Sequence, residues 1–250
     1  MGLIFDIRTA MLYESWCLSH GGKAMELFLE RHLQDLIDPK KGERVLDIGC
    51  GSGNHLLLLN KFGLDINGVD ASPCMISKAR ERLGNRCLLK KGMAEDLPFD
   101  DNEFDIVVLI NTLEFLDDPL QALREAGRVA KRQVFIGVIN SFSVYYNYVK
   151  LCSLYKKSII DSIRPYNLWE LKQLLRDAFG ETPIRWKSSN YSPIQPKKSK
   201  NLVSDTGCSN QLPFGSFLGI SATITYRYKT DSMPLKVRIK NAEQSLTDGI

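Results

Sequence analysis

Two rhythms of apolar residues alternate along the chain. Short continuous apolar runs, such as Phe104 to Ile110, alternate with segments in which apolar residues recur every three or four positions, such as Met25 to Ile37. Continuous runs are typical of parallel strands that helices cover on both faces, and the longer period is typical of amphipathic helices. Their regular alternation predicts βαβ units and therefore an α/β fold with a doubly wound sheet.

Seven strands are expected, and most are followed by a helix. A long segment rich in Ser, Pro, Asn and Lys separates the last two strands, so we expect these two to form an antiparallel hairpin at the edge of a mostly parallel, seven-stranded sheet. The expected strands are 44–48, 65–69, 86–90, 104–110, 133–139, 182–188 and 217–228, and the expected helices include 3–38, 120–129 and 168–179.

The same pattern divides the chain into three parts. Residues 1–42 are expected to form a helical cap or lid, in which His32 lies on the exposed face of an amphipathic helix. Residues 43–228 form the α/β domain, and 140–215 supply its substrate-side elements, where Tyr and Phe are frequent. Residues 229–250 show little apolar periodicity, which is typical of a flexible tail.

The composition narrows the possible partners. An apolar share of 44% is enough for a packed core. The net charge of +4 is mildly basic and lacks the concentrated basic stripe of nucleic-acid-binding proteins, so no nucleic-acid partner is expected. The cluster Lys197, Lys198 and Lys200 is interpreted as a solvated loop, with phosphate or anionic-lipid contact as the alternative. No apolar run approaches the roughly 18 residues of a membrane span, so no transmembrane segment is expected.

The six cysteines are scattered along the chain. They form no CxxC pair and no Cys/His cluster, so we expect neither a metal site nor a disulfide framework. Cys50 lies between two glycines at the most informative turn of the sequence, where oxidation would be harmful. We therefore expect a reducing, cytoplasmic location.

That turn lies within Arg44 to Leu59, RVLDIGCGSGNHLLLL, where a buried strand runs through three glycines into a helix. Glycine lets a ligand approach the backbone closely, and a helix N-terminus offers unpaired N–H groups. We therefore expect bare N–H groups here, with a ligand beside them. The second strand leads to Asp70, 19 positions after Gly51, about where nucleotide sites of α/β proteins place a carboxylate on a ribose diol.

Four motifs in this order resemble those of the class I S-adenosylmethionine-dependent methyltransferases. The closest likeness is to the small-molecule branch that includes the ubiquinone- and menaquinone-biosynthesis enzymes, called methyltransferase type 11. The resemblance covers about residues 13–228 and implies a Rossmann-like fold and S-adenosyl-L-methionine as the methyl donor. The motifs are Val45 to Gly53 (VLDIGCGSG), Gly68 to Ser72 (GVDAS), Gly92 to Phe99 (GMAEDLPF) and Asn111 to Pro119 (NTLEFLDDP).

The third and fourth motifs depart from the family pattern. Many relatives have an aspartate in place of Met93, which binds the adenine amino group, and a histidine in place of Phe115, which can act as a base. Neither Met93 nor Phe115 can take these roles. The resemblance therefore leaves the backbone of residues 94–95 to contact the edge of the adenine ring. The resemblance implies cofactor contacts from Tyr13, Asp47, Gly49, Cys50, Gly51, Asp70, Ala71, Met75, Ala94, Glu95 and Asn111.

Candidates for catalysis and acceptor binding come from the remaining loops. The segment Tyr13 to Gly22 resembles the tyrosine–tryptophan entrance of some relatives, which implies a lid with Tyr13 nearest the sulfonium; ordinary packing is the alternative. The candidates for catalysis are Tyr13, His20 and Glu114, and those for acceptor binding are Trp16, Phe115, Tyr145, Tyr146 and Arg164.

The sequence therefore predicts transfer of a methyl group to an apolar or aromatic small molecule, because the segments expected around the acceptor carry few charges. Two alternatives stay open. One is a protein that binds the cofactor without catalysis. The other is a nicotinamide-dependent oxidoreductase, although Asn54 stands where that class needs the third glycine of GxGxxG. The oligomeric state, monomer or homodimer, is also open.

Overall fold

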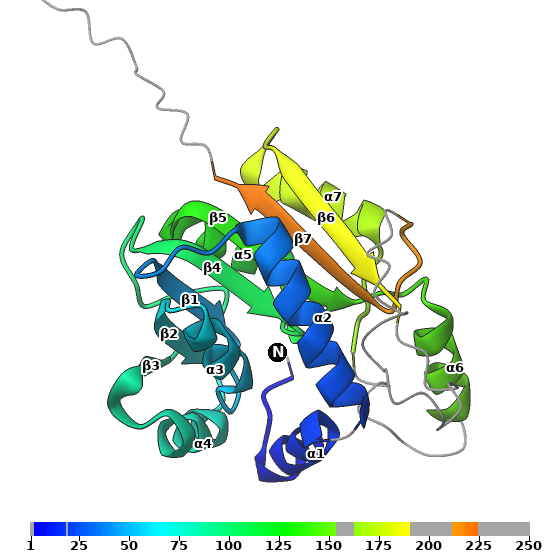
Figure 1. The fold of residues 1–250 in the computed structure, drawn as a ribbon, viewed down its shortest axis with the longest axis horizontal. Coiled ribbons are helices and arrows are strands. Elements are labelled where there is room, and N and C mark those ends of the chain that lie inside the picture. The colour runs from blue at the N-terminus through cyan, green and yellow to red at the C-terminus, as the bar shows by residue number, and fades with distance from the viewer. Residues whose placement is uncertain (1–2, 19, 154–162, 191–211, 225–250) are drawn as a thin grey trace, which may run out of the picture.

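The computed structural model describes residues 3–18, 20–153, 163–190 and 212–224. Its centre is a seven-stranded sheet with the strand order β3-β2-β1-β4-β5-β7-β6 (Figure 1). The strands are β1 (Arg44–Ile48), β2 (Asp65–Asp70), β3 (Leu88–Lys91), β4 (Phe104–Ile110), β5 (Ala130–Ile139), β6 (Ile184–Ser189) and β7 (Phe217–Thr223).

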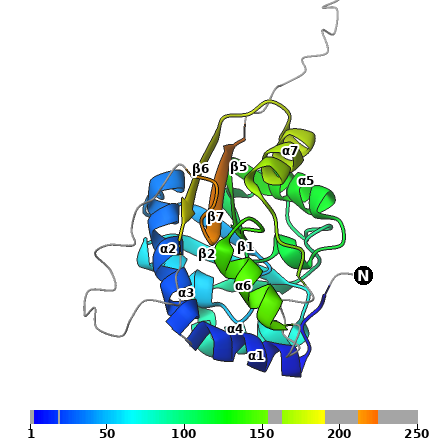
Figure 2. The ribbon, with the colours of Figure 1, turned by 90° about the vertical axis from the view of Figure 1, so that its right-hand side faces the viewer.

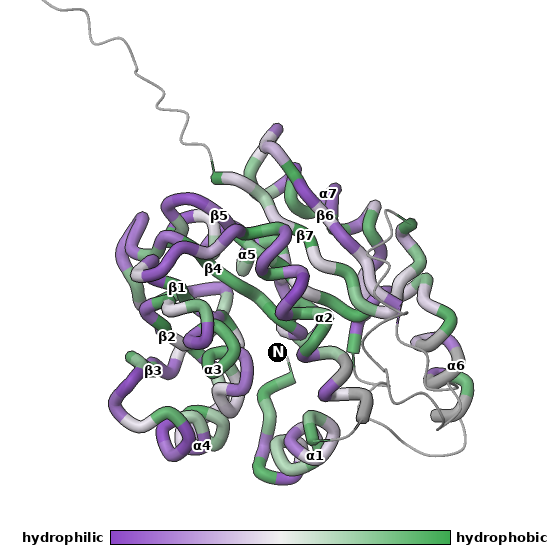
Figure 3. The backbone as a smooth tube through the Cα atoms, viewed as in Figure 1, coloured by the Kyte–Doolittle hydropathy of each residue, from purple (hydrophilic) through white to green (hydrophobic). Residues whose placement is uncertain are grey.

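The direction of the strands confirms the predicted fold class. Strands β1 to β5 pair in parallel, β7 pairs antiparallel with β5, and β6 pairs antiparallel with β7. The last two strands therefore form the expected antiparallel hairpin, with β6 at the sheet edge. The central strands are apolar along most of their length (Figure 3), since helices cover both of their faces.

The helices form one layer on each face of the sheet, as the view in Figure 2 shows for α2 on one side and α5 and α7 on the other. Helices α2, α3 and α4 share a buried apolar cluster with one face, and α5 and α7 share another with the opposite face. The helices are α1 (Ile7–Leu18), α2 (His20–Ile37), α3 (Asn54–Lys61), α4 (Pro73–Leu83), α5 (Pro119–Val129), α6 (Val144–Ser153) and α7 (Leu168–Phe179), with short 3₁₀ turns at Gly84–Arg86 and Leu113–Phe115.

The helical region that we expected over residues 3–38 is divided in the structure. Residues 3–6 are not helical, and two helices follow them. Helix α2 is part of the main fold, because Leu29 and Leu33 are buried in the same cluster as the sheet. Only the segment before it and α1 lie apart from this layer (Figure 1).

The placement of His32 on an exposed face was wrong. Its side chain is 1% exposed, and its Nε2 lies 2.9 Å from the Oγ of Ser189 on β6. Burial lowers the pKa of His32 to about 4, so the ring is neutral at neutral pH. The reason is tertiary: α2 is covered on a second side by the β6–β7 hairpin, and the helical period of α2 alone does not reveal a partner from the other end of the chain.

Several expectations fall outside the residues that the structure describes. These are the tail 229–250, the lysine cluster at 197–200, and the part of the last expected strand beyond residue 224. Within the described part of the chain, no helix is long and apolar enough to cross a membrane.

Candidate functional site

A cavity opens where the parallel strands β1, β2 and β4 end, and it has about 780 Å³ of empty space when the part open to solvent is included. The carboxyl ends of parallel strands are the usual ligand site of doubly wound sheets. The cavity brings together residues from four separate motifs and from the N-terminus. Its lining includes Leu3, Ile4, Phe5, Tyr13, Ile48, Gly49, Gly51, Val69, Asp70, Ala71, Met75, Gly92, Met93, Ala94, Glu95, Ile110, Asn111, Thr112, Phe115 and Leu116.

Two glycines of the first motif serve different purposes. Gly49 has a φ of 72°, and a Cβ built on it would lie 2.4 Å from Cγ2 of Thr112, so it is required for packing. Gly51 has a φ of 52°, but a Cβ on it would meet nothing within 4 Å. Because Gly51 lines the cavity, its missing side chain leaves room for a ligand against the backbone.

The expectation of bare N–H groups does not hold for three residues of this turn. The N–H groups of Gly49 and Cys50 both donate to the Val69 carbonyl, at 2.8 and 3.0 Å. The Gly51 N–H donates to Oδ2 of Asp70 at 2.8 Å. These donors hold the turn to the end of β2. The sequence of the turn alone does not reveal this contact, because its partner is on another strand. The turn therefore does not present these three donors to an anion.

Asp70 is held with its carboxylate at the cavity. Its Oδ1 accepts from the Ser72 N–H at 2.8 Å, and its Oδ2 accepts from Gly51. Burial raises the pKa of Asp70, and these two hydrogen bonds oppose that rise. Each oxygen retains a lone pair for a further donor. The carboxylate is thus fixed in one orientation, as binding of a diol requires.

Asp47 lies under the glycine turn, buried, and is not part of the cavity lining. Neither of its carboxylate oxygens has a hydrogen-bond partner among the described residues. Burial, and to a lesser degree the neighbouring Asp70, raises its pKa well above the ordinary value. An unpaired buried carboxylate is costly, so this end of the site favours a cation or a proton donor. Cys50 is also buried beneath the turn rather than in the cavity.

The opposite end of the cavity is built from Met75 and the third motif. Met75 is buried on α4, and Ala94 and Glu95 lie in a tight turn closed by the Asp96 N–H on the Met93 carbonyl at 3.3 Å. One oxygen of Glu95, Oε2, is buried without a hydrogen-bond partner among the described residues. This end therefore offers an apolar thioether surface beside an unpaired acceptor.

The N-terminal segment forms a wall that the sequence reasoning missed. The Leu3 N–H donates to the Phe115 carbonyl at 3.0 Å, and the Phe5 carbonyl accepts from Oγ of Ser72 at 2.6 Å. The Phe5 ring meets Phe115 edge-on at 5.2 Å and Tyr13 at 5.9 Å. The apolar run of residues 3–5 was the available signal in the sequence. We included it in the helical region 3–38 because apolar residues recur at helical spacing further along the chain.

Glu114 lies beside this aromatic wall without lining the cavity. It is buried, and its Oε1 accepts the Ile139 N–H at 2.8 Å, whereas its Oε2 has no partner among the described residues. Burial raises the pKa of Glu114 to about 7. Burial also raises the pKa of Tyr13 well above its ordinary value, with smaller contributions from Cys17, Asp47 and Glu114, so the Tyr13 hydroxyl stays protonated.

Three acceptor-binding candidates lie outside the cavity lining. Trp16 stacks on Tyr13 with 6.0 Å between ring centroids, and Tyr146 is buried. The Arg164 side chain is exposed over the Tyr166 ring, and the Arg164 N–H donates to the Glu114 carbonyl at 3.0 Å. The side chains of His20 and Tyr145 lie outside the described residues. Phe115 does line the cavity.

No group of three or more His, Cys, Asp or Glu side chains capable of holding a metal occurs in the part of the chain that the structure describes. The site is instead defined by carboxylates, glycines and aromatic rings. Nine of the eleven residues that the resemblance implied for the cofactor line this one cavity, and the other two, Asp47 and Cys50, lie beneath its turn.

Comparison with known proteins shows which proteins this chain resembles. Residues 46–136 match the model of a methyltransferase domain family. An uncharacterized protein of Methanocaldococcus jannaschii is 40% identical over 115 residues, which are 45% of this chain and 49% of that protein. The demethylmenaquinone methyltransferase of Staphylococcus carnosus is 38% identical over 97 residues, 37% of this chain and 40% of the enzyme. The chain thus spans half or less of the length of these curated relatives.

Solved structures extend the likeness over most of the chain. A SAM-dependent methyltransferase of Thermotoga maritima, described as a possible histamine N-methyltransferase, has a TM-score of 0.68 at 26% identity, covering 87% of this chain and 97% of that one. The magnesium protoporphyrin IX methyltransferase of Synechocystis, solved with bound SAH, has a TM-score of 0.60 at 13% identity, covering 90% of each chain. The second likeness shows the fold alone.

Proposed function

We propose that this protein is a class I S-adenosylmethionine-dependent methyltransferase that binds S-adenosylmethionine in this cavity and methylates an apolar or aromatic small molecule. The match of residues 46–136 to a methyltransferase domain family supports the activity, and the acceptor class is inferred from the residues of the chain. The cofactor residues named from the sequence are proposed as the donor site.

The charge of the cavity is the observation that carries this proposal. The unpaired Asp47 and the fixed Asp70 are both acidic side chains, and the N–H groups of Gly49, Cys50 and Gly51 are already used. None of the described cavity-lining residues is Lys or Arg. A pyrophosphate, with two negative charges, would meet the Asp70 carboxylate here and, among the described lining residues, no cationic side chain. S-adenosylmethionine instead brings an ammonium, a sulfonium and a ribose diol, which such a site favours.

We assign the parts of the donor accordingly. The ribose hydroxyls donate to Asp70, and the amino-acid end lies against Gly49 and Gly51, above Asp47. The adenine lies on Met75, and its edge is read by the backbone of Ala94 and by Glu95, whose unpaired Oε2 can accept from an amino group. In this assignment, Ala94 and Glu95 contact the adenine edge, which many relatives bind with an aspartate at the position of Met93.

The donor supplies a methyl group on a sulfonium, which an acceptor lone pair displaces in line. The residues of this chain contribute alignment and exclusion of water, for which effective molarities are large. Phe5, Tyr13 and Phe115 form the wall at the methyl end, and aromatic faces stabilise a nearby cation by roughly 0.5–2 kcal/mol. The same wall gives the acceptor an apolar surface.

Two of the described lining residues, Asp70 and Glu95, are carboxylates, and both are assigned to the donor, so neither serves as a general base at the methyl end. A base must lie within hydrogen-bond reach of the proton it removes, and Glu114 is buried behind the lining with one oxygen bound to Ile139. We therefore propose an acceptor atom with a lone pair available before it loses a proton, such as a neutral amine. The description of the Thermotoga protein as a possible histamine N-methyltransferase is consistent with a small aromatic amine.

The first experiment measures ligand binding by thermal shift and calorimetry with S-adenosylhomocysteine, S-adenosylmethionine and NAD. We expect stabilisation by the first two, about 2.7 kcal/mol at 100 times Kd, and none by NAD. Asp70→Ala should weaken binding of S-adenosylhomocysteine by 100-fold or more, since both ribose contacts are lost. Stabilisation by NAD alone would overturn the proposal, and an unchanged affinity of Asp70→Ala would refute the ribose assignment.

A second candidate is a protein that binds the cofactor without catalysis, which Met93 and Phe115 favour because they replace two functional residues of the family. Radiolabelled methyl transfer to a panel of small aromatic amines and phenols distinguishes the two. Binding with no transfer to any member of the panel would favour the non-catalytic candidate.

A further inference from the structure

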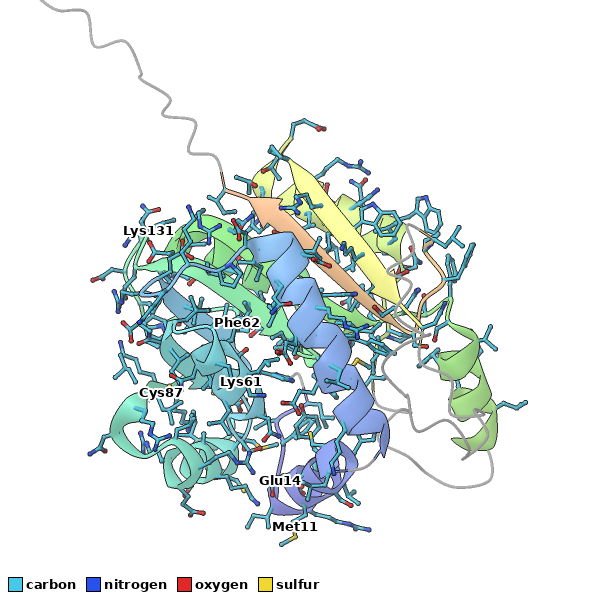
Figure 4. All side chains as sticks on the ribbon, in the orientation of Figure 1. Met11, Glu14, Lys61, Phe62, Cys87 and Lys131 are labelled. Carbon is cyan, nitrogen blue, oxygen red and sulfur yellow. The ribbon has the colours of Figure 1, made fainter. Side chains whose placement is uncertain are left out.

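Helix α1, which carries Tyr13 to the cavity, is weakly held by apolar packing. Ala10 is its only buried residue among those described, although the helix is rich in apolar side chains. Ile7 and Met11 are 64% and 61% exposed, and Met11 points away from the body of the molecule (Figure 4). Burial of apolar area is the usual force that docks a helix, so another interaction must fix the position of α1.

Glu14 supplies such an interaction. Its Oε2 lies 2.6 Å from Nζ of Lys78 and its Oε1 lies 3.1 Å from Nη2 of Arg82, both on α4. The three side chains are only 23%, 27% and 32% exposed, in the same order. The contact with Lys78 holds the pKa of Glu14 below its ordinary value. One carboxylate therefore accepts two charge-assisted hydrogen bonds at a partly buried place.

Arg82 also reaches the glycine turn. Its second nitrogen, Nη1, donates to the Ser52 carbonyl at 2.7 Å, to the Ser52 hydroxyl at 2.8 Å and to Oδ1 of Asn54 at 2.6 Å. Ser52 and Asn54 flank the last glycine of the turn and the start of α3. One planar guanidinium thus joins α1 to the turn that we assign to the amino-acid end of the donor, a geometry that lysine cannot reproduce.

We propose that Glu14, Lys78 and Arg82 are positioning residues that hold α1 closed over the donor and couple this closure to the glycine turn. The proposal rests on the proposed function, since the donor is the ligand that the closed helix retains. Tyr13 adjoins Glu14 in the chain, so the ion pairs set the place of the ring that walls the methyl end. These ion pairs therefore control the rate at which the donor and the product enter and leave the cavity.

An exposed ion pair elsewhere in the chain serves as a matched control for the ion pairs of Glu14. Lys61 on α3, labelled with Glu14 in Figure 4, pairs with Glu26 on α2 at 3.6 Å, with side chains 60% and 52% exposed. Such exposed pairs contribute little. Removing Glu26 changes the charge as much as removing Glu14 does, but it breaks no contact to α4 or to the turn.

The experiment measures the rate of S-adenosylhomocysteine release by stopped-flow fluorescence for the wild type, Glu14→Gln and Glu26→Gln. We expect Glu14→Gln to release the ligand about tenfold faster and Glu26→Gln to match the wild type. Salt should speed release from the wild type and have little effect on Glu14→Gln, since the screened contact is already gone. Lys78→Met should show an intermediate increase, and it replaces Glu14→Gln if that variant does not fold.

Arg82→Lys tests the coupling to the turn. It keeps the charge but loses the planar fork, so we expect faster release and, unlike Lys78→Met, a lower affinity from the freed Ser52 and Asn54. The double variant with Glu14→Gln should be less than additive in release rate. If the wild type does not bind S-adenosylhomocysteine, the proposed function fails. If it binds and Glu14→Gln behaves like Glu26→Gln, the proposed function stands and the positioning role is refuted.

Discussion

The glycine turn and the N-terminal segment both line the cavity, but different forces hold them. Backbone hydrogen bonds to Val69 and Asp70 fix the turn, and its neighbouring strands are buried on both faces. The N-terminal segment and α1 are held by two hydrogen bonds, a few ring contacts and the ion pairs of Glu14. The comparison teaches that the donor side of the site is rigid, whereas the side that we assign to the acceptor depends on a small number of polar contacts.

Glycine substitutions should break the rigid side most strongly. We expect Gly49→Ala to destabilise the protein by roughly 4 kcal/mol, because a Cβ would lie 2.4 Å from Thr112 Cγ2 at a φ of 72°. Gly51→Ala is the matched variant: it carries a similar strain without the clash, so it should cost about 1–2 kcal/mol of stability while it lowers S-adenosylhomocysteine affinity. Urea denaturation and calorimetry measure the two effects. Equal losses of stability would contradict the assignment of different purposes to these glycines.

The buried Glu114 should make stability depend on pH. Its pKa is about 7 in the folded protein and lies near 4.5 when unfolded, so the folded state binds the proton more tightly. This contribution is fully present below pH 4.5 and is lost as pH rises to about 7, by an amount on the order of 3 kcal/mol. We expect the difference in unfolding free energy between wild type and Glu114→Gln to change across this window. A difference that stays constant from pH 5 to pH 8 would show that Glu114 does not titrate there.

The smallest effect is expected at the N-terminal segment. Phe5→Ala removes the ring contacts with Tyr13 and Phe115 and should lower stability by about 1 kcal/mol. Ile7→Ala, at a residue 64% exposed, is the control and should change nothing measurable. If Phe5→Ala instead destabilised the protein as much as Gly49→Ala, the N-terminal segment would belong to the rigid part of the molecule.

The sheet was largely readable from the sequence. The observed β4 and α7 have the predicted bounds, 104–110 and 168–179. Strand β4 is a continuous apolar run, and α7 begins at the Asn167 capping box, in which Asn167 and Glu170 satisfy each other's backbone N–H groups. These signals are local, so they need no knowledge of distant contacts.

The errors share one physical cause. The N–H groups of Gly49, Cys50 and Gly51 are used by β2, and His32 is covered by the β6–β7 hairpin. Each outcome depends on a partner far along the chain. A periodicity or a motif indicates which structure a segment can form. Whether its hydrogen-bond donors stay unpaired, or its polar side stays exposed, depends on the segments that pack against it.

By itself, the sequence determined the sheet, the glycine turn with Asp47 and Asp70, and the resemblance to methyltransferases, because these depend on apolar period, on glycine and on motif order. Only the tertiary structure decided that β2 uses the N–H groups of Gly49, Cys50 and Gly51, that residues 3–5 wall the cavity, and that Arg82 connects α1 to the turn. These features arise where segments distant in sequence compete for the same donors and acceptors. The geometry of packing settles that competition, and local sequence does not encode it.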